Sequence, residues 1–152
     1  MAASKRQGEG IHRAIAGLQR LADLLAERRA QLAQEAGLTE QQWRVLEQIA
    51  APGFLPSLFA RRSETTPAAV SKVLRQLLEK GLVSVSISER DARQRDYALS
   101  AKGRRALARI ETAREEAVAE VWAPLDPRDV RRFAELADEL AGRLERYVGE
   151  RR

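Results

Sequence analysis

The stretch "SERDARQRDYALS" (88–100) places six charged side chains in thirteen positions, with arginines alternating with aspartates. A guanidinium binds phosphate or the edge of a base. Arg90, Arg93 and Arg95 are therefore candidate contacts for a polyanion such as a nucleic acid. An acid in the same place repels phosphate, so we expect Asp91 to be structural: it pairs with Arg93 or Arg95, or it caps the turn.

A second set of polar side chains lies on one face of the segment 66–80. Apolar residues such as Val70, Leu74 and Leu77 fall on one side of a helix at about 100° per residue, and the polar set falls on the other. Lys72 and Arg75 can donate to guanine or to phosphate, and an alanine here can touch a thymine methyl. The outward set is Thr66, Ala68, Ala69, Ser71, Lys72, Arg75 and Gln76.

Composition argues against several other kinds of chemistry. The chain has 152 residues, no cysteine and one histidine, so disulfides, thiolate sites and typical metal clusters are not expected. No nucleophile–base pair and no Gly-rich phosphate loop is found, so we expect neither an enzyme nor a cofactor. No apolar run is long enough to span a bilayer, and residues 1–10 do not read as a signal peptide. The expected location is the cytoplasm.

The positive charge is concentrated in the middle of the chain. Between residues 61 and 109 there are twelve Lys or Arg and five Asp or Glu, a net charge of +7. The whole chain carries +5, so the remainder carries −2. A local excess of this kind is the pattern that nucleic-acid binding requires.

Hydrophobic periodicity, caps and breakers predict the elements that must position these side chains. Thr39 and Gln42 have the spacing of a capping box, and Thr66 followed by Pro67 predicts a capped helix start. The pattern predicts helices over 9–35, 39–50, 56–62, 67–80, 101–122 and 127–148, with a β-hairpin over 82–99. In the hairpin, Ile87, Tyr97 and Leu99 are expected to anchor the strands.

Helix, short turn, capped helix and hairpin form the winged variant of the helix-turn-helix. The sequence thus predicts a mainly α fold with a small β-hairpin wing, plus a helical dimerisation layer from both chain ends. The predicted divisions are a dimerisation helix (1–36), the winged helix-turn-helix (37–100) and C-terminal helices that complete the layer (101–152).

The segment "DARQRDYALSAKG" (91–103) resembles the D-x-R…L-[ST]-x-x-G signature of MarR-type regulators, matched by Asp91, Arg93, Leu99, Ser100 and Gly103. The segments 38–49 and 68–83 are also similar to that family. The resemblance implies a homodimer whose paired recognition helices bind a pseudo-palindromic operator. The segment 38–46 is most similar to regulators of aromatic-acid catabolism operons. One departure is "SET" (63–65), which replaces the usual apolar–Gly–apolar turn.

The terminal helices carry apolar stripes with few neighbours inside one chain, and a symmetric dimer is the commonest way to cover them. The resemblance also implies a small anionic aromatic effector, an aromatic carboxylate or a phenol, bound between the dimer layer and the winged domain. His12 can pair with a carboxylate there or be simply exposed. The candidate pocket residues are His12, Ile15, Gln19, Trp43, Arg44 and Phe54.

These observations favour a sequence-specific DNA-binding transcriptional regulator, a homodimeric repressor released by the effector. The alternative is a winged-helix protein-interaction module that binds no DNA, which an acidic or neutral recognition face would favour. The face of the segment 66–80 is basic, so the DNA-binding hypothesis is preferred.

Overall fold

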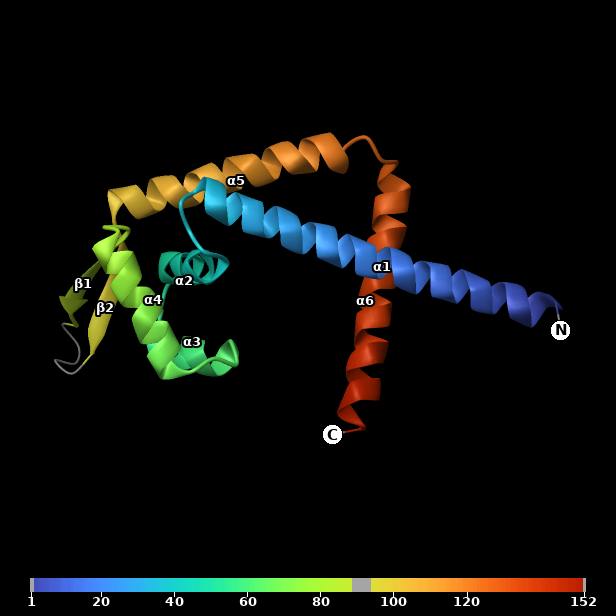
Figure 1. Ribbon diagram of the computed structural model, residues 1–152, viewed down its shortest axis with the longest axis horizontal. Coiled ribbons are helices and arrows are strands. Elements are labelled where there is room, and N and C mark those ends of the chain that lie inside the picture. Colours follow the sequence, from blue (N-terminus) through green and yellow to red (C-terminus); the bar gives the residue numbers. More distant parts are fainter. Residues whose placement is uncertain (1, 89–93, 152) are drawn as a thin grey trace. The chain divides into compact units, whose positions relative to one another are not determined.

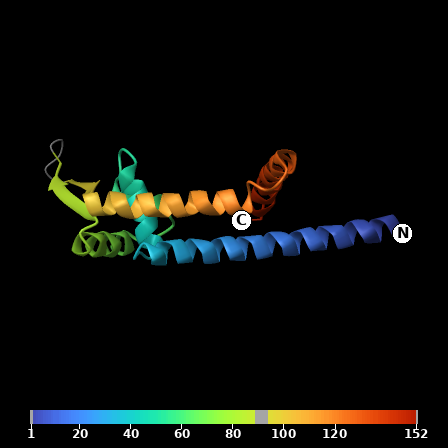
Figure 2. The ribbon, with the colours of Figure 1, turned by 90° about the horizontal axis from the view of Figure 1, so that it is seen from above.

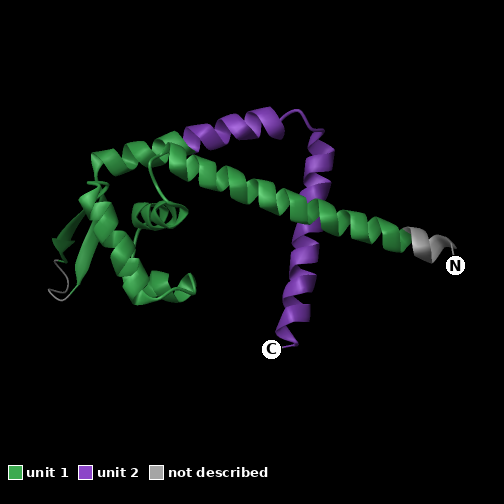
Figure 3. Cartoon of the chain, in the orientation of Figure 1, with its two compact units in different colours: residues 1–110 green, residues 111–152 purple. Residues whose placement is uncertain are grey.

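A computed structural model describes residues 2–88 and 94–151. The chain forms two compact units, Met1–Ile110 and Glu111–Arg152 (Figure 3). The elements run α1 (Ala2–Glu35), α2 (Glu40–Ala50), α3 (Pro56–Arg62), α4 (Pro67–Glu79), β1 (Val83–Ile87), β2 (Arg95–Leu99), α5 (Ala101–Val121) and α6 (Pro127–Gly149) (Figure 1). The order from α2 to β2 is the predicted winged helix-turn-helix.

Helix α1 begins at Ala2, seven residues before the predicted start. The predicted start at residue 9 followed the apolar stripe, which begins at Ile11, but nothing in "MAASKRQGEG" stops a helix, and an isolated glycine in a helix costs only about 1 kcal/mol. Figure 2 shows α1 as one continuous rod. Its side chains from Glu9 to Glu27 are exposed, whereas Leu32 and Ala33 are buried.

The core of the first unit lies between α2, α4 and the base of the hairpin. Its largest fully buried side chains are Trp43, Val45, Leu46, Val70 and Leu77. The predicted capping box starts α2: the Thr39 hydroxyl accepts from the Gln42 N–H at 3.1 Å, and the Gln42 side chain accepts from the Thr39 N–H at 3.1 Å. The apolar stripes of α2 and α4 thus meet as their spacing predicts.

Arg29 joins α1 to α2. Its guanidinium lies 4.3 Å from the centre of the Trp43 ring, a cation–π distance. The same side chain lies 3.4 Å from Glu40 and 4.0 Å from Glu47. One arginine therefore fixes the last third of α1 against the winged segment.

The wing is an antiparallel two-stranded sheet in which Val83 pairs with Leu99, Val85 with Tyr97, and Ile87 with Arg95. Val83 is buried and Tyr97 is half-buried. The prediction that Ile87 anchors the sheet is wrong, because its side chain is 71% exposed. Strand β1 contacts α4 and β2 contacts α2. Along β1, Val83 is buried, whereas Val85 and Ile87 are exposed.

Three helices of this unit end in the same C-terminal motif, in which the second residue beyond the cap donates back to a carbonyl in the last turn. Leu38 donates to Ala33, and Leu82 donates to Leu77. In both, the residue before the donor is a glycine in the left-handed region, with φ of 71° and 67°. After α3, Thr65 donates to Ala60 in the same way, but the left-handed residue is Glu64, with φ of 49°.

Glu64→Gly is expected to stabilise the protein by about 0.5–1 kcal/mol. The substitution relieves left-handed strain of about 1–2 kcal/mol, and the greater freedom of glycine in the unfolded chain offsets part of this. The melting temperature should rise by about 1–4 °C. Glu64→Ala keeps the strained Cβ and is the matched control, for which we expect no rise. Equal melting temperatures for the two variants would show that the turn is unstrained.

The second unit contains the end of α5 and α6. The Asp126 carboxylate accepts from the Arg128 N–H at 2.8 Å and caps α6, and Pro127 occupies the first turn. The rings of Trp122 and Phe133 lie 6.3 Å apart across the bend. None of residues 111–151 is buried, since two helices have too little facing surface to cover an apolar stripe.

Candidate nucleic-acid interface

Helix α4 presents one covered side and one open side. The Thr66 hydroxyl accepts from the Ala69 N–H at 3.1 Å and begins the helix, as predicted, with Pro67 in its first turn. Its buried side chains are Val70, Val73, Leu74 and Leu77. Of the predicted contact residues, five are exposed and two are half-buried: the exposed ones are Thr66, Ala68, Ser71, Lys72 and Arg75, and the half-buried ones are Ala69 and Gln76.

Lys72 and Arg75 are the two cations in the middle of this open side. Neither has an ion-pair partner among the residues that the structure describes. An unpaired, solvated cation loses little on transfer to a phosphate or a guanine edge, because no internal contact has to break. The open side of α4 is therefore a cationic surface available for a ligand.

A polar network holds the C-terminal half of α4. Lys80 Nζ donates to the Gly37 carbonyl and to Gln42 Oε1, each at 2.9 Å. Gln42 Nε2 donates to Gln76 Oε1 at 3.0 Å. Gln42 is only 3% exposed, so its two bonds to Lys80 and Gln76 are partly shielded from water, whereas the bond from Lys80 to Gly37 is exposed. The network ties the end of α4 to the α1–α2 connection.

The junction between hairpin and α5 explains the motif around Ser100. The Ser100 hydroxyl donates to the Gly81 carbonyl at 2.7 Å and accepts from the Gly103 N–H at 3.0 Å. The Ser100 N–H donates to the Leu82 carbonyl at 3.0 Å. A Cβ on Gly103 would overlap that same carbonyl oxygen. Serine and glycine at this spacing therefore lock the base of the wing to the end of α4.

Two further cations serve this junction and not the open face. Lys102 Nζ donates to the Lys80 carbonyl at 2.7 Å. Arg104 Nη1 donates to the Leu99 carbonyl at 2.8 Å. Part of the local excess of positive charge is thus used to cap carbonyls at the ends of α4 and β2.

Of the three candidate arginines of the wing, the structure describes Arg95. Arg95 is exposed at the start of β2, opposite Ile87. Arg90, Asp91 and Arg93 lie outside the described residues, so their predicted roles stay predictions.

The six candidate ligand residues do not converge in the first unit. Ile15 and Gln19 lie on the exposed length of α1, as does His12, whose Nδ1 lies 2.7 Å from the Gly8 carbonyl oxygen. Arg44 is exposed, and Trp43 is core beneath Arg29.

Phe54 has a different setting. Its ring lies 6.1 Å from Phe59 and 6.1 Å, edge-on, from Tyr97. It lines an open pocket of about 400 Å³, with residues 49–53, Asp96 and Tyr97. None of the other five predicted residues lines this pocket, so the effector site stays a prediction.

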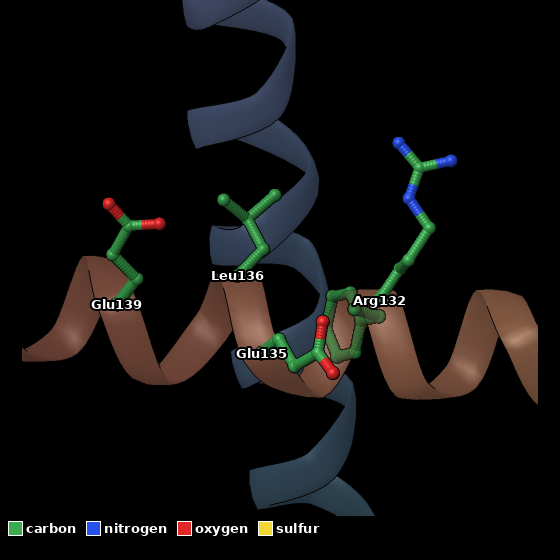
Figure 4. Close-up of a pocket in the computed structure, with 5 residues that line it drawn as sticks. Arg132, Glu135, Leu136 and Glu139 are labelled. Atoms are coloured by element: carbon green, nitrogen blue, oxygen red, sulfur yellow. The ribbon is translucent and has the colours of Figure 1, made fainter.

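A second open pocket, of about 340 Å³, lies along α6. Figure 4 shows Arg132, Leu136 and Glu139 on one side of that helix, with Glu135 in front. The described residues contain no group of three His, Cys, Asp or Glu side chains placed to hold a metal ion.

Sequence reasoning missed Gln42, Lys80, Lys102 and Arg104 as residues that position the site. Gln42 was recognised only as half of a capping box, because that partner is three residues away. Its partners on α4 are 34 and 38 residues away. No local spacing signals such a contact.

Comparisons with known proteins bear on the fold. The model of the MarR family matches residues 36–94. A search of curated proteins gave no match. A solved MarR family transcription regulator has 15% identity and a TM-score of 0.84, over 97% of this chain and 99% of that one.

Two more solved structures are similar. The YusO protein from Bacillus subtilis has 22% identity and a TM-score of 0.73, over 87% of this chain and 94% of its own. The complex of S. aureus MepR with DNA has 20% identity and a TM-score of 0.62, over 82% of this chain and 96% of that one. These likenesses confirm the mainly α fold with a hairpin wing.

Proposed function

We propose that this chain, whose residues 36–94 carry the MarR-family winged helix-turn-helix, is a transcription regulator that binds double-stranded DNA as a homodimer. The open cationic side of α4 carries the proposal. Lys72 and Arg75 project from a helix whose other side is buried and whose two ends are tied down. A rigid helix of this kind fits a major groove, where Arg and Lys donate to guanine or phosphate.

The dimer rests on apolar surface that each unit leaves uncovered. In α1 the exposed apolar side chains are Ile11, Ile15, Leu18, Leu21, Leu24 and Leu25. In the second unit they are Val118, Val121, Leu125, Phe133, Leu136, Leu140, Leu144, Tyr147 and Val148. Apolar side chains left exposed at helical spacing along one helix are typical of an interface. A homodimer also fits DNA, because two recognition helices about 34 Å apart read successive major grooves.

The finer parts of the proposal follow the family resemblance. The regulator acts as a repressor in the cytoplasm, on a pseudo-palindromic operator, and a small anionic aromatic molecule releases it. In this proposal the protein acts by binding alone, without a catalytic step or a cofactor. Along the described residues, no helix has the length and apolarity needed to cross a membrane.

Selection of duplexes from a random DNA pool tests the function directly. We expect a pseudo-palindromic sequence to be enriched, bound by two chains per site in gel-shift titrations. Screening aromatic carboxylates against that complex tests the effector. A protein that retains no duplex at low salt, where cationic contacts are strongest, would favour the protein-interaction module instead.

Leu136→Glu is expected to convert the dimer to a monomer and to weaken operator binding at least about tenfold. A carboxylate on the exposed apolar stripe of α6 would lose its hydration in the dimer interface without gaining an ion-pair partner, and this cost opposes dimerisation. Ala134→Glu, about 160° around the same helix, adds the same charge elsewhere and should stay dimeric. Light scattering gives the mass, and a Leu136→Glu variant with the wild-type mass would place the interface elsewhere.

A further inference from the structure

The amide of Gln42 is held by three hydrogen bonds whose chemistry fixes which way it points. Its oxygen accepts from Lys80 Nζ at 2.9 Å and from the Thr39 N–H at 3.1 Å. An ammonium and a backbone N–H can only donate. The atom that faces both must be the oxygen, and the NH₂ group must point the other way, toward α4.

The orientation of Gln42 in turn fixes that of Gln76. The NH₂ group of Gln42 meets the Gln76 side chain at 3.0 Å. An NH₂ group has no acceptor, so the atom of Gln76 that faces it must be the carbonyl oxygen. Reversing the Gln76 amide would set two NH₂ groups against each other at a site where Gln42 is buried. The Gln76 oxygen is therefore turned toward α2.

The NH₂ group of Gln76 is then the one left for an outside partner. Gln76 is half-buried and adjoins the exposed Arg75, with Lys72 one turn earlier on the open side of α4. A free glutamine reads adenine with both ends of its amide, accepting from N6 and donating to N7. A glutamine whose oxygen is engaged by Gln42 offers donors only.

We propose that Gln42 is a specificity-determining residue, which holds Gln76 as a hydrogen-bond donor so that α4 reads guanine or thymine at one base pair and discriminates against adenine. Guanine presents O6 and N7 there, and thymine presents O4, all acceptors. Gln42 acts through Gln76 and does not itself touch DNA. The inference rests on the proposed function.

Selection from a random duplex pool, with the full-length wild-type chain and two variants, tests this inference. Gln76→Ala should flatten the base preference at one position of each half-site and leave the others intact. Gln42→Glu should reverse that preference. One carboxylate oxygen still accepts from Lys80 and Thr39, while the other forces Gln76 to donate inward and to present its oxygen. Adenine or cytosine, whose amino groups donate, should then be enriched about tenfold over guanine or thymine.

The outcomes distinguish a failure of this inference from a failure of the proposed DNA-binding function. A merely structural Gln42 would weaken binding to every sequence equally, so an unchanged motif in Gln42→Glu overturns the proposal. A motif unaltered by Gln76→Ala overturns it too. If circular dichroism shows that Gln42→Glu does not fold, Gln42→Met replaces it: Gln76 is then free, adenine should become accepted, and continued rejection of adenine contradicts the proposal. A wild-type chain that selects no sequence refutes both proposals.

Discussion

Gly103→Ala is expected to lower the free energy of unfolding by about 2–3 kcal/mol, the largest stability change that this structure predicts for one methyl group. The added Cβ would overlap the Leu82 carbonyl oxygen and approach the Leu82 carbonyl carbon to 3.1 Å. That oxygen is backbone and already accepts from the Ser100 N–H, so it cannot swing aside as a side chain does. The first turn of α5 must shift away from the base of the wing.

Gly142→Ala is the matched control. Gly142 also lies inside a helix, but the nearest atom to its added Cβ is the flexible Arg146 Nη1, at 3.7 Å. Helix propensity alone should make this variant more stable by up to about 1 kcal/mol. Urea unfolding of both variants gives the comparison. A Gly103→Ala variant as stable as Gly142→Ala would mean that the junction relaxes freely, and that the glycine of the motif is not a packing requirement.

Arg75→Ala and Lys72→Ala are each expected to weaken binding of the selected operator by at least about tenfold. The proposed homodimer would lose two contacts per substitution, and each contact to a base or phosphate is worth about 1–3 kcal/mol. Fluorescence anisotropy of the labelled duplex measures the dissociation constant. Repeating it at several salt concentrations separates the two kinds of contact. Loss of a phosphate contact reduces the salt slope by about one per contact, whereas loss of a base contact leaves the slope and relaxes the sequence preference.

Arg143→Ala controls for the change in net charge. Arg143 is exposed on α6 and pairs with Glu139, so its removal subtracts the same charge away from α4. We expect its affinity to stay within about twofold of the wild type, since the positive charge of Arg143 is already offset by the paired Glu139 carboxylate. If all three variants weaken binding alike, the effect is general electrostatic attraction, and α4 is not the recognition helix.

The positions of helices and caps were largely predictable because their signals are local. A capping box spans three residues, and Thr66 with Pro67 marks the start of α4 within a single turn. The bounds of α3 and the end of the hairpin at Leu99 agree with prediction to the residue. The predictions that failed needed non-local information. Ile87 alternates correctly for an anchored strand, yet its side chain is 71% exposed.

The candidate site divides in the same way. The outward position of Lys72 and Arg75 follows from helical periodicity, which the sequence contains. The Ser100–Gly103 motif was recognised by resemblance, but its reason is tertiary: one hydroxyl bridges two segments, and one missing Cβ admits the Leu82 carbonyl.

By itself, the sequence determined the winged order of elements, the helix caps and the basic side of α4, because each depends on residues within a few turns of one another. Only the tertiary structure decided which polar groups of that side are free. Gln76 appears in the sequence as one more outward polar residue. Its oxygen is engaged because Gln42, 34 residues earlier, is buried against it with its own oxygen occupied by Lys80 and Thr39. Each hydrogen bond in this network fixes the orientation of the next amide through a tertiary contact. The spacing of residues along the sequence does not reveal these contacts.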